Sequence, residues 1–450
     1  MAPSRIPAPD ADPSPLGQSL HFEFSGKAAP NRFLKGAMTE RLSSWDLKEV
    51  QKRGIPSKEL INMYRRWGEG GLGLIVTGNV MLYYDQLEAR GNSVIPRDAP
   101  FFDERFQAFS DLAAQAKAHG SLIVAQLSHP GRQAPDSIQP YPVSASDVHL
   151  EGTALGSTFA KPRAMTKEEI RDVVDRFGYA AEYLHRAGYD GVQIHGAHGY
   201  LIAQFLSQTT NKRTDEYGGP LPNRARLVFE IVDEIRRRVP DGAFVVGVKL
   251  NSVEFQHGGF TPAECGDLCA ALEGRGVDFV ELSGGTYQRL AFSHRRESSA
   301  RREAFFLEFA DAIAPRLART RVYVTGGFRT TAAMVAALGP AHGVGLARPL
   351  AHEFDLARKL LEGGAKSAAD YGIDEQDFAL SLIAAGTQMR LVGRDKEPLE
   401  LGRPEHRAAF DTALRQFEKE MENDRDGSRY GFMDIDGIKL EPYGTPYETG

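Results

Sequence analysis

Short apolar runs alternate with longer amphipathic segments from about residue 31 to residue 350 of the chain. The short runs are rich in β-branched and aliphatic residues, which is typical of strands that are buried on both faces. Eight predicted strands follow from this pattern: Phe33–Thr39, Leu72–Leu82, Leu122–Leu127, Gly191–His195, Phe244–Leu250, Phe279–Ser283, Val322–Thr325 and Gly343–Leu346.

The segments between these strands carry the signals of helix ends. Thr166–Glu169 and Thr261–Glu264 each have the capping-box pattern, in which the first and fourth residues satisfy each other's backbone N–H groups. A third segment has an apolar stripe of Leu60, Tyr64 and Trp67. Gly68, directly after it, is a predicted helix stop. Helices therefore alternate with the strands.

Eight strands with intervening helices predict an α/β fold of the (β/α)8 TIM-barrel type. A doubly wound sheet is the alternative, and it predicts a GxGxxG turn after an early strand that the sequence does not contain. We expect the barrel to span residues 21–360. Residues 1–20 are proline-rich without an apolar core, so they are expected to form a flexible lead-in rather than a targeting signal.

Two further segments lie outside the predicted barrel strands. The alternating stretch Leu20–Phe24 predicts a hairpin that closes the barrel floor. Residues 361–450 predict a helical extension followed by an arm, with helices at Phe378–Met389 and His406–Met421. The tail Tyr430–Gly450 is either disordered or packed against a neighbouring subunit, and the sequence does not decide between the two. The oligomeric state is also left open, with a homodimer or a higher homo-oligomer possible.

The composition narrows the class of partners. Of the 450 residues 42% are hydrophobic and 25% are charged, the net charge is −6, and no dense basic block is present. Nucleic acid and anionic membranes are therefore poor candidates, and no apolar run is long enough to cross a bilayer. The two cysteines, Cys265 and Cys269, fit a reducing, cytoplasmic environment and cannot build a four-cysteine iron–sulfur cluster.

Three polar side chains lie close together where the fourth predicted strand ends. His195, His198 and Tyr200 are separated only by small residues, so a ligand can come close to them. Both imidazoles can donate a hydrogen bond to one oxygen atom, and the phenol is a possible proton donor. A histidine pair can also bind zinc, but a site would need a third ligand, and we expect no metal here.

The stretch from Asp190 to Gly219 resembles the active-site strand of the Old Yellow Enzyme family of flavin-dependent ene-reductases. The loop that follows the strand also matches the family, with Asn211, Arg213, Asp215 and Tyr217. The resemblance covers roughly residues 22 to 356, and it implies a barrel that binds FMN.

The resemblance also implies which residues meet the flavin ring. Ala37, Met38 and Thr39 end the first strand, and the Thr39 hydroxyl would stabilise charge that develops on the flavin. Gly78 would let the ring approach the second strand, and Gln126 would pair with the pyrimidine edge. Lys249 stands where the family more often has arginine, and as a buried cation it would need the flavin as its partner.

The last two predicted strands end in glycine-bearing loops, the usual phosphate site of such barrels. Gly326 and Gly327 follow the seventh strand, and Gly345 and Arg348 lie at the end of the eighth. Backbone N–H groups and the Arg348 guanidinium would hold the FMN phosphate.

The reaction that the resemblance implies is NAD(P)H-dependent reduction of the C=C bond of an α,β-unsaturated carbonyl compound. His195 and His198 would hold the carbonyl oxygen, Tyr200 would protonate the carbon next to it, and Tyr287 and Ser128 would shape the pocket. Two alternatives stay open: an FMN-dependent oxidase, isomerase or dehydrogenase that acts on a secondary metabolite, and a barrel without catalytic activity.

Overall fold

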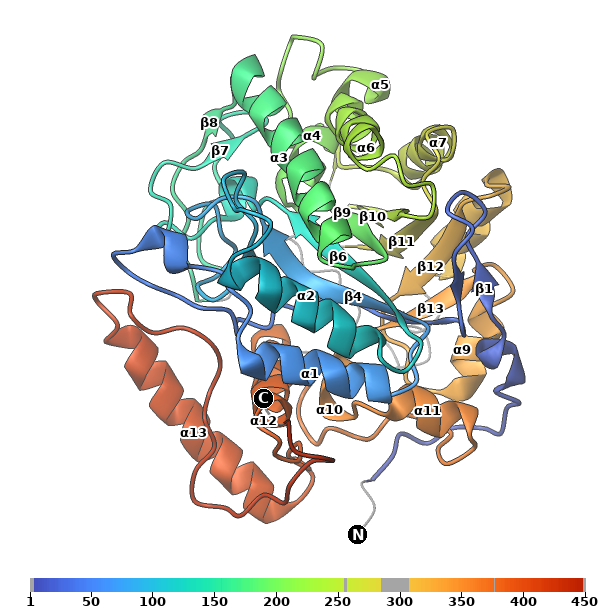
Figure 1. Ribbon diagram of the computed structural model, residues 1–450, viewed down its shortest axis with the longest axis vertical. Coiled ribbons are helices and arrows are strands. Elements are labelled where there is room, and N and C mark those ends of the chain that lie inside the picture. The colour runs from blue at the N-terminus through green and yellow to red at the C-terminus, as the bar shows by residue number, and fades with distance from the viewer. Residues whose placement is uncertain (1–3, 155, 255–256, 285–306, 376, 448–450) are drawn as a thin grey trace.

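Eight parallel strands form a closed barrel in the computed structural model, which describes residues 4–154, 156–254, 257–284, 307–375 and 377–447 (Figure 1). The barrel strands are β3 (Phe33–Lys35), β4 (Leu74–Met81), β6 (Leu122–Ser128), β9 (Gly191–Gly196), β10 (Val245–Asn251), β11 (Phe279–Ser283), β12 (Arg321–Thr325) and β13 (Gly343–Leu346). Strand β3 pairs with both β13 and β4, which closes the barrel. The predicted fold and all eight strands are confirmed.

The first barrel strand is shorter than predicted. Its ladder ends at Lys35, and the last bond to β13 runs from the Gly36 N–H to the carbonyl oxygen of Leu346, 2.7 Å apart. Beyond that point the chain leaves the ladder, and Thr39 lies at the mouth of the barrel rather than in a strand.

The other elements surround the barrel or cover its two ends. The longer helices are α1 (Lys58–Glu69), α2 (Glu104–Lys117), α3 (Lys167–Arg186), α6 (Arg226–Arg238), α7 (Pro262–Glu273), α12 (Phe378–Gly393) and α13 (Pro404–Glu422). The shorter helices are η1 (Ser14–Gly17), η2 (Val50–Lys52), η3 (Gly131–Gln133), α4 (Leu201–Leu206), α5 (Leu221–Arg224), η4 (Ala314–Arg316), α9 (Thr331–Ala337), α10 (Arg348–His352) and α11 (Leu356–Leu361). The short strands are β1 (Leu20–His21), β2 (Ala28–Ala29), β5 (Ser93–Val94), β7 (Val143–Ser144) and β8 (Arg163–Ala164).

Both predicted capping boxes are present, at the first turns of α3 and α7. The predicted stop at Gly68 is wrong, because α1 continues to Glu69. A Cβ atom at Gly68 would lie 2.4 Å from the carbonyl oxygen of Ala116. The glycine therefore allows α2 to pack closely against α1 instead of ending the helix.

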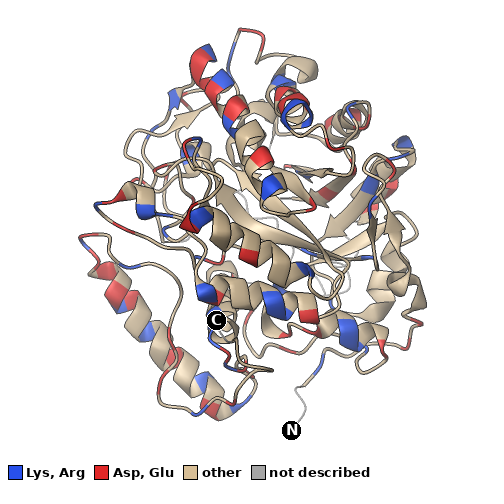
Figure 2. Cartoon of the chain, in the orientation of Figure 1, with Lys and Arg blue, Asp and Glu red and all other residues tan. Residues whose placement is uncertain are grey.

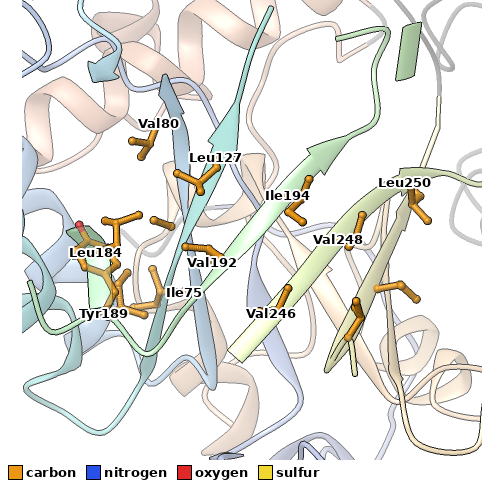
Figure 3. Close-up of a cluster of buried hydrophobic side chains, with 14 of the residues drawn as sticks. Ile75, Val80, Leu127, Leu184, Tyr189, Val192, Ile194, Val246, Val248 and Leu250 are labelled. Atoms are coloured by element: carbon orange, nitrogen blue, oxygen red, sulfur yellow. The ribbon is translucent and has the colours of Figure 1, made fainter. Parts of the chain in front are cut away.

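Side chains alternate between the inside of the barrel and the layer under the helices, because strand side chains point to opposite faces in turn. Val192 and Ile194 of β9, and Val246, Val248 and Leu250 of β10, belong to the core between strands and helices (Figure 3). The lower interior forms a second apolar cluster, the floor, made of Leu20, Phe22, Ala29, Leu34, Leu74, Val76, Val124, Val245, Phe279 and Tyr323.

The predicted hairpin is present below the barrel, where β1 pairs antiparallel with β2. Its side chains Leu20 and Phe22 are buried in the floor. The segment before it was expected to be flexible, but it has defined contacts with the barrel. Leu16 is fully buried, and Arg5 forms an ion pair with Glu353.

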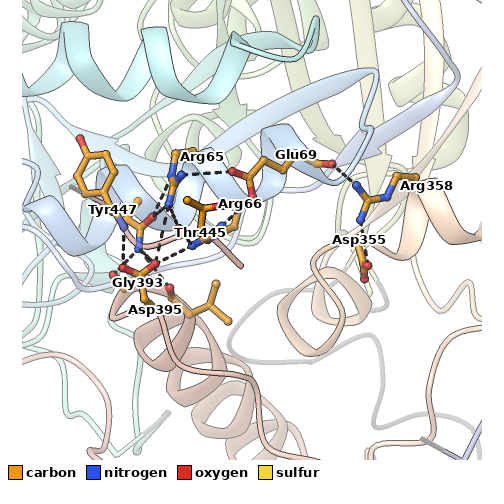
Figure 4. Close-up of polar contacts among 11 residues, drawn as sticks. Arg65, Arg66, Glu69, Asp355, Arg358, Gly393, Asp395, Thr445 and Tyr447 are labelled. Carbon is orange, nitrogen blue, oxygen red and sulfur yellow. Dashed lines mark hydrogen bonds and ion pairs between the residues drawn. The ribbon is translucent and has the colours of Figure 1, made fainter. Parts of the chain in front are cut away.

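The C-terminal extension packs on its own chain. Helix α12 contacts α1 and α10, and α13 lies further out and carries charges of both signs (Figures 1 and 2). Part of the tail is held by Asp395, whose carboxylate accepts hydrogen bonds from the Arg66 guanidinium at 2.7 Å and the Tyr447 N–H at 2.9 Å (Figure 4). In the described part of the chain no helix is long and apolar enough to span a bilayer.

The Asp395→Asn substitution is expected to loosen the arm. Asparagine tolerates the left-handed backbone of this position (φ 57°) and keeps its shape, but it removes the charge that Arg66 meets. Losing hydrogen bonds to a charged group should lower the free energy of unfolding by about 1–3 kcal/mol. Chemical denaturation measures the loss, and limited proteolysis should cut the tail faster.

Asp436→Asn is the matched control, because Asp436 is an exposed carboxylate of the same tail. An Asp395→Asn protein that unfolds and is cleaved like the parent would show that this contact does not fasten the arm.

Candidate active site

One cavity opens at the carboxyl ends of the barrel strands and brings together most of the predicted site residues. Its lining includes Ala37, Met38, Thr39, Gln126, His195, His198, Tyr200, Lys249, Gly326, Gly327, Gly345 and Arg348. These residues come from six of the eight strand ends. A barrel collects its functional groups at this face because parallel strands all end there.

Three predicted residues are not part of this lining. Ser128, expected to shape the pocket, is fully buried and does not line the cavity. Tyr287 lies outside the described residues. Gly78 lies behind the wall: a Cβ atom there would be 2.0 Å from the Glu40 carboxylate and 2.3 Å from the Met38 carbonyl oxygen. Its glycine therefore makes room for Glu40, and the neighbouring Asn79 is the residue of β4 that faces the cavity.

The two histidines of the cavity are held in defined orientations. The Ala197 N–H donates to Nδ1 of His195 (3.3 Å), so the hydrogen of this ring is on Nε2. His198 has a left-handed backbone (φ 58°), and its N–H donates to Asn251 Oδ1 at 3.0 Å. Nε2 of His198 lies 3.0 Å from the Ser283 hydroxyl.

Both imidazoles are neutral at physiological pH. Burial lowers the pKa of His195 well below its usual value, and the neighbouring His198 and Lys249 add to the effect. Burial, with a contribution from Lys249, lowers the pKa of His198 to about 3. Neutral imidazoles can donate hydrogen bonds to a ligand oxygen without carrying a charge.

Tyr200 stands beside this pair at the start of α4. Its ring centroid lies 4.7 Å from that of His195, at an interplanar angle of 70°. The side chain is 6% exposed and lines the cavity. A phenol and two imidazole donors therefore meet at one wall of the cavity.

A layer of polar side chains fills the barrel interior between this cavity and the apolar floor. Gln126 donates to Gln193 (2.7 Å), and Gln193 donates to Glu281 (2.7 Å). Lys249 and Thr325 donate to the other carboxylate oxygen of Glu281, at 2.8 and 2.7 Å. Lys249 thus already has a buried counterion, which corrects the expectation that the flavin would supply it.

Sequence analysis missed Gln193 and Glu281, although their signal was present. Each is a polar residue in the middle of a strand, with apolar neighbours on both sides. Strand alternation places such a residue inside the barrel, and a buried polar group needs a partner.

The Thr39 hydroxyl also has a different environment from the expected one. It donates to the buried carboxylate of Glu88 at 2.8 Å, and Glu88 forms an ion pair with Arg41 at 3.1 Å. The hydroxyl also accepts a hydrogen bond from the Asn92 amide at 3.4 Å, and its remaining lone pair can accept one from a ligand in the cavity. Glu88 itself lines the cavity and was not predicted.

Glycines and arginines gather at the end of the cavity formed by β12 and β13. Gly327 has a left-handed backbone (φ 76°), which favours glycine, and Arg348 begins α10. Gly345 leaves room for the Thr325 side chain, because a Cβ atom there would lie 1.8 Å from Oγ1. Ala347 has φ −117°, so this position does not need the left-handed backbone that favours glycine.

Helix α12 adds an apolar wall that the sequence did not reveal. Phe378, Leu382, Ala385 and Met389 face the cavity at helical spacing. This part of the chain was expected to be an extension outside the barrel. It is instead a side of the site.

The residues of the cavity fit FMN by their donor chemistry. Gln126 and Lys249 offer polar groups at the bottom, where a pyrimidine edge needs both donors and acceptors. Arg348 and the glycine loops offer a guanidinium and backbone N–H groups at the far end, which suits a phosphate. Among the described residues, no three His, Cys, Asp or Glu side chains come together as a metal site.

Comparison with known proteins agrees with this arrangement. Residues 22–367 match the model of the NADH:flavin oxidoreductase / NADH oxidase family. The "NADH-dependent flavin oxidoreductase nadA" of Aspergillus parasiticus is 51% identical over 392 residues, which are 87% of this chain and 88% of that protein.

Solved structures share the fold. Morphinone reductase in complex with tetrahydroNAD gives a TM-score of 0.64 at 22% identity, over 81% of this chain and 96% of that one. A 2-naphthoyl-CoA reductase complex gives a TM-score of 0.68 at 24% identity, over 78% of this chain and 52% of that longer one. Together the matched residues and the site assign the chain to the NADH:flavin oxidoreductase / NADH oxidase family, the Old Yellow Enzyme family of FMN-dependent oxidoreductases.

Proposed function

We propose that this enzyme uses NADH to reduce the C=C bond of α,β-unsaturated carbonyl compounds. One observation carries the proposal: two neutral imidazoles and a phenol meet at one wall of the cavity, from a single strand end. Binding of a carbonyl oxygen needs donors, and saturation of an alkene needs a proton source. This wall has both.

His195 and His198 are the proposed anchors for the carbonyl oxygen. Their ring centroids are 5.2 Å apart and nearly perpendicular, which lets two N–H groups approach one oxygen from different directions. Hydrogen bonds to that oxygen draw electrons from the conjugated alkene, and they strengthen as negative charge develops on the oxygen. Since both rings are held in place before substrate arrives, little reorganisation is needed.

Tyr200 is the proposed proton donor to the carbon next to the carbonyl. Its ring contacts His195, so its hydroxyl lies on the same wall as the oxygen anchors. Bound FMN would supply the hydride chemistry, taking it from the nicotinamide and giving it to the other alkene carbon. The apolar residues of α12 exclude water and provide a surface for a hydrophobic substrate.

Tyr200→Phe tests the function by separating two half-reactions. The substitution keeps the ring and removes only the hydroxyl, so FMN binding and flavin bleaching by NADH should change little. The reoxidation of the flavin by cyclohexenone should slow by about 10²–10⁴, the range for loss of a positioned general acid. Stopped-flow absorbance measures both rates, with Tyr141→Phe, at an exposed surface tyrosine, as the control.

Equal slowing of the two half-reactions would assign Tyr200 a structural role. If the parent consumes NADH only with oxygen and never with enones, the proposal fails, and the oxidase alternative gains support.

The oxygen anchors have a separate test in phenol binding, because a phenolate oxygen imitates the substrate oxygen. His195→Ala should weaken phenol binding to the oxidised enzyme by about 1–3 kcal/mol. His198→Asn should cost less, because asparagine keeps an N–H donor and accepts the left-handed backbone. Absorbance titration with phenols gives the dissociation constants.

His185→Ala, at a half-exposed histidine of α3, is the control. The pKa of His198 is lowered to about 3, so between about pH 5 and 8 the binding of a phenol should show no step from protonation of this ring. Unchanged phenol affinity in His195→Ala would remove this residue from the anchoring role.

A further inference from the structure

Glu281 is a carboxylate in the middle of the barrel that the reaction described above does not use. It lies on β11, it is 0% exposed, and it faces the interior between the apolar floor and the cavity. Burying a charge at this depth is costly unless it is paired and hydrogen-bonded. Three donors from three other strands meet it: Lys249 at 2.8 Å, and Gln193 and Thr325 both at 2.7 Å.

These donors keep the carboxylate ionised. Burial favours the neutral form of Glu281, but the charge of Lys249 and the hydrogen bonds from Lys249, Thr325 and Gln193 outweigh it, so the pKa stays below its usual value. An ionised carboxylate can only accept hydrogen bonds. Because Glu281 can only accept, it fixes the orientation of the two side-chain amides between it and the cavity, those of Gln193 and Gln126.

The direction of each amide follows from the one before it. Gln193 must turn its NH₂ group to Glu281, which leaves its Oε1 facing Gln126. Gln126 must then donate its own NH₂ group to that oxygen, which leaves the Oε1 of Gln126 on the other side of its amide. Gln126 lines the cavity, so the group it can present there to a ligand N–H is an acceptor.

The Glu281 carboxylate also neutralises the positive charge of Lys249. Lys249 also lines the cavity, where the family more often has arginine, and its ammonium group is 2.8 Å from Glu281 with its side chain 4% exposed. A ligand in the cavity therefore meets the N–H donors of Lys249 in a pair whose net charge is zero. This pattern of acceptor and donors suits the neutral pyrimidine edge of oxidised FMN.

We propose that Glu281 is a positioning residue for FMN: it neutralises Lys249 and, through Gln193, turns the carbonyl oxygen of Gln126 toward the flavin edge. This inference rests on the proposed placement of FMN over Gln126 and Lys249. It does not depend on which substrate the enzyme reduces.

The test compares three variants of the FMN-loaded enzyme. Glu281→Gln removes the negative charge at constant shape. Glu281→Gln/Lys249→Met removes both charges, and Gln193→Met cuts the connection to Gln126 while leaving the charged pair intact. Two readouts are used: the dissociation constant of FMN, from flavin fluorescence, and the midpoint potential of the bound flavin, from a dye-coupled titration.

Glu281→Gln should shift the potential to more positive values, because the uncompensated lysine favours the electron-rich flavin. A tenfold change in the reduction equilibrium corresponds to about 30 mV for a two-electron couple. The double variant should return toward the parent potential. Gln193→Met should weaken FMN binding about five- to tenfold, the effect of one lost hydrogen bond, and change the potential less than Glu281→Gln.

An unchanged potential in Glu281→Gln would show that the carboxylate does not neutralise Lys249 and would overturn the proposal. Parent-like FMN affinity in Gln193→Met would overturn the amide relay. If Glu281→Gln does not fold but the double variant does, the charge compensation is supported, because the unpaired lysine is then the cause. Enone turnover of the parent is measured separately, so a failed ene-reductase function and a failed role of Glu281 give different results.

Discussion

Closure of the barrel is the constraint on which the site depends. Because β3 is bonded on one side to β13 and on the other to β4, every second side chain of the eight strands must point into a closed interior. The lower interior is filled by apolar side chains such as Phe279 and Tyr323. The upper interior holds hydrogen-bonded polar groups, and there the enclosure forces Lys249 to have a counterion within the same layer.

Much of this organisation could be predicted from the sequence, because it depends on patterns within single segments. Apolar runs and capping boxes gave the strands and two of the helix starts, and the ends of those strands gave the histidines, Tyr200 and the glycine loops. These residues meet in space because the parallel strands of a barrel all end at the same face.

The predictions that failed concern pairs between segments far apart in the chain. The partners of Thr39 and Lys249 are Glu88 and Glu281, 49 and 32 residues away, and no local pattern relates them. Gly68 looks like a helix stop because glycine often follows the end of a helix. Its actual role is to leave room for the Ala116 carbonyl oxygen of the neighbouring helix. Likewise, the wall formed by α12 depends on where a distant helix docks, which its own apolar sequence does not specify.

The position of α12 has a consequence for the order in which the site is built. A polypeptide leaves the ribosome from its N-terminus, and the barrel strands end at Leu346, about a hundred residues before the last residue of the chain. The cavity wall of His195, His198 and Tyr200 can therefore exist while Phe378 and Met389 are not yet made. Until Tyr447 emerges, the hydrogen bond from its N–H to Asp395 is also missing. The cavity is thus enclosed late in synthesis, after the polar residues that it surrounds have been made.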